Sequence, residues 1–382
     1  MTGSRSGPLS GCRVVEIAGI GPTPFCGMML ADMGAEILRV EPPQPLTGDP
    51  HYDRSKDVLL RGRGSITLDL KRPEAVNAVL ALAAKADVLL EGYRPGVMER
   101  LGLGPEVCFA SNRRLVYARM TGWGQAGPLA HKAGHDINYF ALSGSLHMCG
   151  RANEHPSPNL NFVADMGGGG MLMAFGIACA LFEAGRSGHG QVIDAAMVDG
   201  SALLAAQIHG LRAMGWWSDR RGSNLLDCGA PYYDVYETRD GGFMAVGALE
   251  DKFYANLLEG LGFDPVELPD RADPTHWATL REYFAERFRS RTRSEWVEIF
   301  DRIDACATPV LAPDEAACHP HMLARRSFGT LDGVQQPMPA PRFSRTPGAV
   351  AGPPPVDDSN GWRMARNWGL SDPQIELLRA ND

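Results

Sequence analysis

The chain has 382 residues, of which 44% are hydrophobic, and its formal net charge at pH 7 is -8. A chain of this kind can bury a sizeable core, and its length predicts about two domains. The negative charge argues against nucleic acid or an anionic membrane surface as a partner, so we expect a small-molecule partner.

Targeting signals and cysteine pattern indicate the compartment. The amino-terminal stretch "MTGSRSGPLSGC" lacks the apolar segment of a signal peptide, and the longest apolar stretch, "MLMAFGIACALF" from Met171, is too short to span a bilayer. The eight cysteines form no C-x-x-C pair, which predicts reduced, mostly buried thiols. We therefore expect a cytoplasmic protein without a membrane partner. "CHPH" at 318–321 could ligate a metal, but nothing nearby completes a four-ligand set, so none is expected.

The first 125 residues alternate strand-like apolar runs with helical segments, which predicts a parallel sheet covered by helices. The strand-like runs are "RVVEIAG" from 13, "EILRVEP" from 36, "SITLDL" from 65, "DVLLEGY" from 87 and "LVYARMTGWG" from 115. After the first run we expect a helix capped by Thr23, with Pro24 at its first position and Gly34 in a left-handed conformation past its end. No G-x-G-x-x-G follows that run, which disfavours a dinucleotide cofactor.

The pattern of predicted strands and helices changes near residue 230. "YYDVYETRDGGFMAVGAL" predicts an antiparallel hairpin with a glycine-containing turn, followed by helical stretches. We expect a large α/β domain formed by residues 1–200 and 330–382, a linker helix and loop over 201–229, and a small α+β domain over 230–329. The proline-rich stretch before "DPQIELLRA" predicts a tail that wraps a surface and ends in a short helix.

Two segments carry residues suited to chemistry. In "AGHDINYFALSG", His135 and Asp136 precede an apolar helix, and in "LNFVADMGGGGMLMAFGIACALFEAG", Asp165 precedes four glycines and a long apolar helix. A histidine before a helix is commonly a structural hydrogen-bond donor, and an aspartate at such a place commonly caps the helix. Capping needs no string of four glycines, whereas a ligand close to free backbone N–H groups does, so the glycine run favours a site.

The motifs "AGHDINY", "LNFVADMGGGG", "GHGQVIDAAMVDG", "GAPYYDVYETRDGGFMAVGALEDKFY" and "DACATPVL" closely resemble those of the 2-methylacyl-CoA racemases of the family III CoA-transferase (CaiB/BaiF) superfamily, from about residue 8 to about 345. The resemblance implies a large domain with a parallel Rossmann-like sheet, a smaller α+β domain and an interlocked homodimer. It also implies that His135 and Asp165 are the acid/base residues, that Glu250 is the partner of His135, and that the enzyme acts on acyl-CoA thioesters in lipid metabolism without a separate cofactor.

The chemistry of such a reaction explains the residue types. Inverting carbon 2 of a 2-methylacyl thioester requires one group to remove a proton from one face and another to return a proton to the opposite face, through an enolate. Backbone N–H groups after His135 are candidates to stabilise the enolate oxygen. The alternative is CoA transfer between carboxylic acids through an anhydride of Asp165. That alternative has no use for His135, so the intact pair favours the racemase.

Coenzyme A requires cations for its phosphates and a slot for adenine, and Arg94 and Arg100 suit phosphate. By resemblance, the residues that bind CoA or substrate are Thr67, Leu68, Asp69, Leu70, Gly92, Tyr93, Arg94, Arg100, Gly134, Asp136, Ile137, Asn138 and Tyr139, and Arg39 is a further candidate. The carboxylate of Asp136 is expected to bind polar substrate groups or to cap its own helix. Pro42 stands where these racemases usually carry an arginine, with Arg39 or the "RGRG" segment at 61–64 as possible substitutes.

Overall fold

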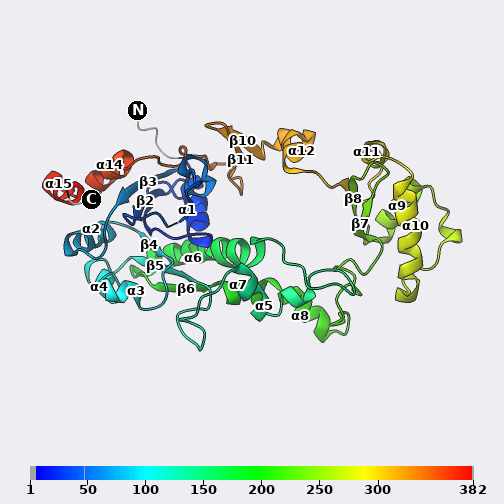
Figure 1. The fold of residues 1–382 in the computed structure, drawn as a ribbon, viewed down its shortest axis with the longest axis horizontal. Helices are drawn as coiled ribbons and strands as arrows, with labels where there is room; N and C mark the ends of the chain where they lie inside the picture. The colour runs from blue at the N-terminus through cyan, green and yellow to red at the C-terminus, as the bar shows by residue number, and fades with distance from the viewer. Residues whose placement is uncertain (1–5, 47, 381–382) are drawn as a thin grey trace. The chain divides into compact units, whose positions relative to one another are not determined.

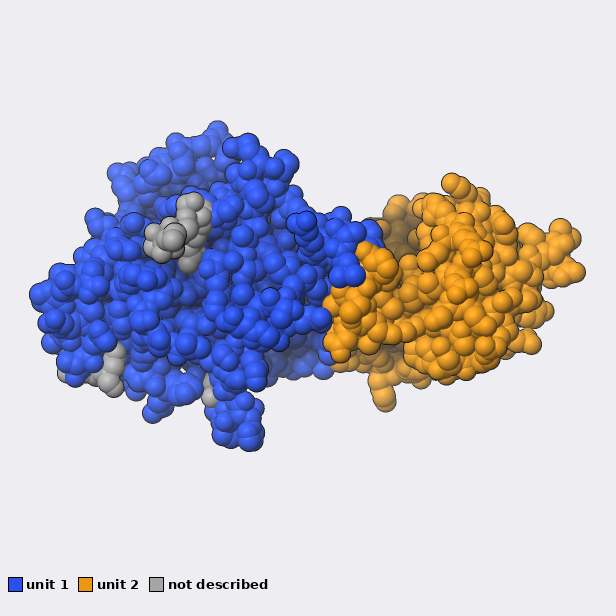
Figure 2. All heavy atoms as spheres, turned by 90° about the horizontal axis from the view of Figure 1, so that it is seen from above, with its two compact units in different colours: residues 1–143, 159–204, 321–382 blue, residues 144–158, 205–320 orange. Residues whose placement is uncertain are grey.

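The computed structural model describes residues 6–46 and 48–380. The chain forms two compact units, drawn in two colours in Figure 2. Unit 1 comprises Met1–Ser143, Asn159–Leu204 and His321–Asp382, and unit 2 comprises Gly144–Pro158 and Ala205–Pro320.

Unit 1 is built on a sheet of six parallel strands in the order β3-β2-β1-β4-β5-β6 (Figure 1). The strands are β1 (Arg13–Ile17), β2 (Glu36–Glu41), β3 (Arg63–Thr67), β4 (Val88–Glu91), β5 (Val116–Thr121) and β6 (Val192–Ala196). The predicted parallel sheet is confirmed, with its first five strands where the apolar runs place them. The strand order reverses between β1 and β4, and in such sheets ligands bind at the carboxyl ends of the strands beside this switch point.

Edge strand β6 is not predicted from the sequence. Its first three residues are exposed or half-buried and only its last two are buried, so it shows no continuous apolar run. An edge strand has a neighbour on one side only, and its pairing with β5 follows from the tertiary fold.

The first helix, α1 (Pro22–Asp32), begins earlier than predicted. Gly21, with φ 64°, is its N-cap and Pro22 its first residue, so the expected cap at Thr23 is wrong. Pro22 and Pro24 both suit the first turn, because the N–H that proline lacks would have no partner within the helix there. The expected left-handed glycine past the helix end is confirmed, since Gly34 has φ 98°.

Helices cover both faces of the unit 1 sheet. Side chains alternate along each strand, so Val15 and Ile17 of β1 face the core that holds α2 (Pro73–Ala83), whereas Glu16 faces α1. The remaining helical elements of this unit are η1 (Arg54–Lys56), η2 (Val58–Leu60), α3 (Val97–Arg100), α4 (Pro105–Ser111), α5 (Asp136–Leu142), η4 (Phe162–Met171), α6 (Leu172–Ser187), α7 (Met197–Leu204), α13 (Pro320–Arg325), α14 (Ser359–Asn367) and α15 (Asp372–Arg379).

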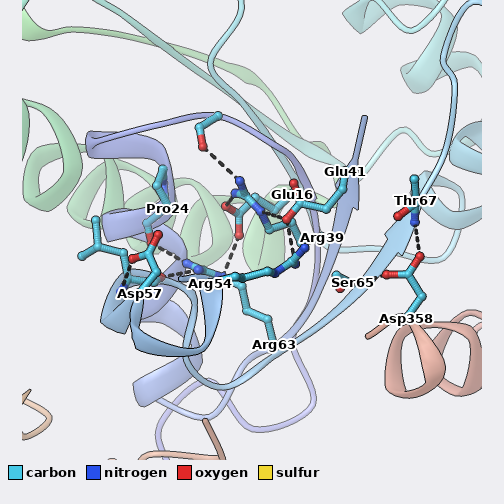
Figure 3. A network of polar contacts seen from close by, with 12 residues as sticks. Glu16, Pro24, Arg39, Glu41, Arg54, Asp57, Arg63, Ser65, Thr67 and Asp358 are labelled. Atoms are coloured by element: carbon cyan, nitrogen blue, oxygen red, sulfur yellow. Dashed lines mark hydrogen bonds and ion pairs between the residues drawn. The ribbon is translucent and has the colours of Figure 1, made fainter. Parts of the chain in front are cut away.

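The carboxyl-terminal segment returns to the sheet of unit 1. After the short hairpin of β10 (Phe328–Leu331) and β11 (Val334–Pro337), helix α14 packs on β3 (Figure 1, red). The Asp358 carboxylate accepts the Thr67 backbone N–H at 2.7 Å and the Ser65 hydroxyl at 3.2 Å (Figure 3). The tail thus secures the strand at the outer edge of the sheet.

The glycine run lies inside a helix and not before one. The π-helix η4 starts at Phe162 and continues directly into α6, and Asp165 stands in its first turn. A Cβ atom at Gly168 would lie 2.8 Å from backbone atoms of α7, and one at Gly170 would lie 2.6 Å from the Phe25 ring of α1. The expectation that these glycines leave room for a ligand is therefore wrong, because they allow α1 and α7 to approach the helix closely.

The continuous helix Phe162–Ser187 is also longer than the apolar stretch visible in the sequence. By length and composition alone it could cross a membrane, so the expectation that no apolar segment is long enough is wrong. A core helix passes the same test. Here, however, only 39% of its most apolar window is buried within the chain.

Unit 2 has a three-stranded antiparallel sheet in the order β7-β8-β9. The predicted hairpin is confirmed as β7 (Tyr233–Glu237) and β8 (Phe243–Gly247), and β9 (Ala307–Pro309) adds a strand that is not predicted. An aromatic core including Phe284, Phe288 and Trp296 fills the unit. Its helical elements are η3 (Leu146–Met148), α8 (Ala206–Ala213), α9 (Asp251–Leu261), η5 (Pro265–Glu267), η6 (Pro274–His276), α10 (Trp277–Arg289), α11 (Arg293–Phe300) and α12 (Pro313–Cys318).

Candidate active site

A cavity of about 350 Å³ opens in unit 1 at the carboxyl ends of β1, β4 and β5. Its lining residues are Ile20–Thr23, Gly92–Pro95, Met120–Trp123, Ala130, Lys132–His135, Tyr139, Asp165 and Met197. His135 and Asp165, thirty residues apart in the sequence, thus line one pocket beside the switch point, which is where parallel sheets bind ligands.

His135 is held at the start of α5. It is the extended N-cap residue of that helix, and its backbone N–H donates to Asn138 Oδ1 at 3.0 Å. The ring of Tyr139 fills the space left by two glycines of the pocket wall: a Cβ at Gly122 would lie 2.1 Å from it, and one at Gly134 2.7 Å. The backbone around His135 is thereby fixed, while its side chain is exposed to the pocket.

Asp165 is half-buried in the first turn of η4. Burial raises the pKa of this carboxyl group above its ordinary value, and the negative charge of Asp136 raises it further, whereas Asn161 and His135 lower it. Asn161 Nδ2 lies 3.4 Å from Asp165 Oδ2, and a Cβ at Gly21 would lie 3.4 Å from the same oxygen. A carboxyl group with a raised pKa is more readily protonated near neutral pH, as a proton donor must be.

Asp136 does not line the pocket. It is 6% exposed, and its Oδ2 accepts the backbone N–H groups of Ala164 and Asp165, each at 2.8 Å. The expectation that it binds substrate or caps its own helix is therefore not supported by its contacts, since it caps η4.

A second, apolar slot of about 220 Å³ adjoins the first cavity. It is lined by Val40, Pro42, Pro43, Leu68, Asp69, Leu70, Lys71, Tyr93, Val97 and Leu101. Tyr93 lines both cavities, so the predicted segments 68–70 and 92–94 meet at one continuous site. Arg94 is exposed in the first cavity. Other predicted binding residues lie elsewhere on the surface of unit 1. Arg100 is exposed at the end of α3, and Thr67 borders another hollow beside Leu59 and Leu60. Ile137 and Asn138 are exposed on the first turn of α5.

The arginines expected to substitute for the arginine missing at position 42 have other partners, and Figure 3 shows those of Arg39 and Arg63. Each nitrogen of the Arg39 guanidinium has a hydrogen bond, to Glu16, to Glu41 at 2.6 Å and to the Gly19 carbonyl at 3.0 Å. The two arginines of the "RGRG" segment are buried, with exposed fractions of 1% and 2%. Arg61 pairs with Asp32 and Arg63 with Glu16 at 2.8 Å. None of these three guanidinium groups is free for phosphate.

Glu250 lies in unit 2, exposed at the N-cap of α9. Its role as the partner of His135 stays a prediction. Glu91, which is not predicted, supports the pocket wall, because its Oε2 accepts the Tyr93 backbone N–H at 2.7 Å and Oε1 lies 2.9 Å from Arg119 Nε. Gly21, Trp123, Lys132 and Met197 are lining residues that are also not predicted. Position at the carboxyl ends of β1 and β5 is the signal that could have identified Gly21 and Trp123.

The eight cysteines all lie within the described residues, and none of them is in a disulfide there. Only Cys26 and Cys108 are buried, while Cys179, Cys306 and Cys318 are exposed, so the expectation of mostly buried thiols is wrong. Across residues 6–46 and 48–380, no group of three or more His, Cys, Asp or Glu side chains is placed to hold a metal ion.

Fold and pocket together define an α/β protein with a histidine and a carboxyl group of raised pKa at the switch point of a Rossmann-type sheet. The model of the family described as CoA-transferase family III matches residues 9–359, and the chain belongs to that family.

Relatives with sequence or structural similarity cover nearly the whole chain. The alpha-methylacyl-CoA racemase of Mus musculus is 48% identical over 98% of this chain and 96% of its own. The alpha-methylacyl-CoA racemase of Homo sapiens is 47% identical over 89% of this chain and 87% of its own. The crystal structure of a CaiB/BaiF family protein from Brucella suis superposes with a TM-score of 0.83 at 26% identity, covering 95% of this chain and all of that one.

Proposed function

We propose that this protein is a racemase that interconverts the (2R) and (2S) epimers of 2-methylacyl-CoA thioesters. The observation that carries the proposal is that His135 and Asp165 line one cavity at the switch point. The similarity to two alpha-methylacyl-CoA racemases supports it.

The two side chains supply the proton chemistry. For one epimer, neutral His135 removes the proton on carbon 2 and protonated Asp165 delivers a proton to the opposite face of the enolate. For the other epimer, the Asp165 carboxylate removes the proton and the His135 imidazolium delivers one. The pair needs one proton between its two members, so the raised pKa of Asp165 favours a shared proton near neutral pH.

The enolate and the CoA moiety need further groups. Backbone N–H groups in the first turn of α5, beside His135, are the proposed donors to the enolate oxygen. The apolar slot lined by Leu68, Leu70 and Tyr93 is the proposed site for adenine, with Arg94 and Lys71 near the phosphates. Proton transfer between two side chains requires no separate cofactor, since CoA enters as part of the substrate.

We also propose that the protein is a homodimer, as the family resemblance implies. The support is an exposed apolar stripe on the helix η4–α6, at helical spacing, in which Met171 is 52%, Phe175 66% and Phe182 70% exposed. Contiguous apolar surface of this kind in a soluble protein marks an interaction site. A second copy of the chain would cover it.

Heavy water distinguishes the racemase from the transferase. A single-epimer 2-methylacyl-CoA is incubated with the protein in heavy water without an acceptor acid, and carbon 2 is followed by NMR. We expect exchange with inversion in the wild type and loss of inversion in His135→Ala and Asp165→Ala. Movement of CoA to an added acid without exchange at carbon 2 would support the transferase instead. If both variants still invert the substrate, the assignment of the pair is wrong.

A further inference from the structure

Asp136 connects the two proposed acid/base residues. It follows His135 directly in the chain, and its Oδ2 accepts the backbone N–H of Asp165 and that of the preceding Ala164, both at 2.8 Å. The side chain is buried, with 6% of the residue exposed. The residue next to one base therefore holds the peptide unit that carries the other.

The helix that bears Asp165 depends on this contact. The first N–H groups of a helix have no partner within it and need an acceptor from elsewhere. Asn161, the N-cap residue of η4, makes no capping hydrogen bond with its side chain. Asp136 supplies the acceptor from a segment 28 residues earlier. A carboxylate is well suited to this place, because negative charge is favoured at a helix N-terminus.

We propose, on the basis of the racemase function above, that Asp136 is a positioning residue that sets the geometry between His135 and Asp165. Proton transfer to opposite faces of one carbon requires both groups to stay within hydrogen-bond reach of it, and small displacements cost rate. Asp136 is joined to His135 by one peptide bond and to the backbone of η4 by two hydrogen bonds. These links fix the distance between His135 and Asp165, and the Asp136 side chain does not occupy the pocket.

The charge of Asp136 has a second effect. Among residues 6–46 and 48–380, its buried Oδ1 has no hydrogen-bond partner, and Asp136 forms no salt bridge with them. The carboxylate therefore acts on Asp165 without a neutralising cation beside it, and it favours the protonated form of Asp165. The other charged or titratable groups near Asp165 are His135, Arg94, Lys132 and Tyr139 of the pocket wall; Asp199 of the adjacent α7 is exposed.

Replacing this charge has a defined kinetic consequence. A neutral residue at 136 should lower the pKa of Asp165. In one direction, less of Asp165 then carries the proton that it must donate at neutral pH. In the other direction, its carboxylate is a weaker base. The equilibrium between the epimers belongs to the substrates alone, so kcat/KM must fall by the same factor in both directions. A purely structural role of Asp136 predicts lower stability without a change in the pH profile.

The decisive variant is Asp136→Asn, whose side-chain oxygen can still accept the two N–H groups. We expect the unfolding midpoint to stay close to that of the wild type and KM to change less than about twofold. The kcat should fall severalfold, by the same factor in both directions, because Asp165 holds its proton less readily without the charge of Asp136. The acid limb of the kcat profile should move to lower pH. Asp136→Ala, which also loses the hydrogen bonds, should lose more activity and some stability.

Asp199→Asn is the matched control, since it removes an exposed carboxylate from α7 and should leave the pH profile unchanged. If Asp136→Asn does not fold, Asp136→Ser, which keeps a neutral acceptor, takes its place. A wild-type kcat in folded Asp136→Ala, which loses both hydrogen bonds, would overturn the positioning role. A wild-type kcat and pH profile in folded Asp136→Asn would overturn the effect of its charge on Asp165. If instead His135→Ala and Asp165→Ala retain inversion, the proposed function fails, whatever Asp136 does.

Discussion

Gly200 of α7 lies so close to Gly168 of η4 that a Cβ atom added at Gly200 would fall 1.9 Å from the Gly168 carbonyl oxygen. This backbone-to-backbone contact holds the helix that carries Asp165 against α7. The glycine run therefore serves the site through packing, by placing the first turn of η4 beside the pocket.

Gly200→Ala should destabilise the protein by about 1–3 kcal/mol, because the two helices must separate to admit the methyl group. The free energy of unfolding from denaturant titration measures this loss. Gly185→Ala is the control: Gly185 is an exposed residue of α6 with nothing within 4 Å of an added Cβ, and alanine there should be neutral or stabilising. Equal stability of the two variants would contradict the packing role.

Gly21→Ala should lower kcat by more than its loss of stability accounts for. Gly21 has φ 64°, and an added Cβ would lie 3.4 Å from Asp165 Oδ2, on the wall of the pocket. Gly11→Ala imposes a comparable backbone strain, at φ 86°, with open space around the Cβ. Both variants should lose about 1 kcal/mol of stability, but only Gly21→Ala should lose activity in the inversion assay. Parallel losses of activity in the two would argue against a specific contact with Asp165.

Glu91 should make stability depend on pH. Burial raises its pKa from 4.5 to about 7 despite the ion pair with Arg119. A raised folded-state pKa means that the stabilising contribution is complete below the unfolded value and is lost as pH rises through about 7. Relative to Glu91→Gln, the wild type should lose on the order of 3 kcal/mol between pH 4 and pH 8.

Glu99, which also pairs with Arg119, should make stability depend on pH in the opposite direction. It is exposed, and its hydrogen bond to Arg119 lowers its pKa. Its contribution should therefore disappear as pH falls below the ordinary carboxyl range, which Glu99→Gln would show. Unfolding measured across pH for both variants tests the pair, and a flat difference curve for Glu91→Gln would contradict the burial argument.

Arg94→Ala should weaken the binding of CoA thioesters. The guanidinium is exposed in the cavity, and charge-assisted hydrogen bonds to phosphate are worth about 1.5–3 kcal/mol, so the dissociation constant should rise about 10- to 100-fold. The difference should shrink at high salt. Calorimetry with a non-reactive acyl-CoA measures it, with Arg302→Ala, an exposed arginine of unit 2, as the control. Unchanged affinity would remove Arg94 from the CoA site.

Phe175→Glu together with Phe182→Glu should convert a dimer into monomers, because charges on the apolar stripe oppose its burial against a second copy. Sedimentation equilibrium measures the change. Val266→Glu, at a residue of η5 that is 91% exposed, should leave the dimer intact. A monomeric wild type would contradict the proposal for this surface.

The sequence by itself determined the features that depend on local patterns. Five strands and the hairpin of unit 2 follow from apolar periodicity, since each strand buries its own residues. The motifs around His135 and Asp165 indicated the family to which the chain belongs, and they are the basis of the proposed acid/base pair.

The tertiary structure decided which partners those residues have. The sequence offers Arg39, Arg61 and Arg63 as candidates for phosphate binding. In the structure all three are buried and form ion pairs with acidic residues as far as 47 positions away in the chain. Asp136 caps a helix that begins 26 residues later, and the glycines meet α7 instead of a ligand. Such pairings depend on which segments the fold brings together, and a local pattern carries no information about a partner so distant in the chain.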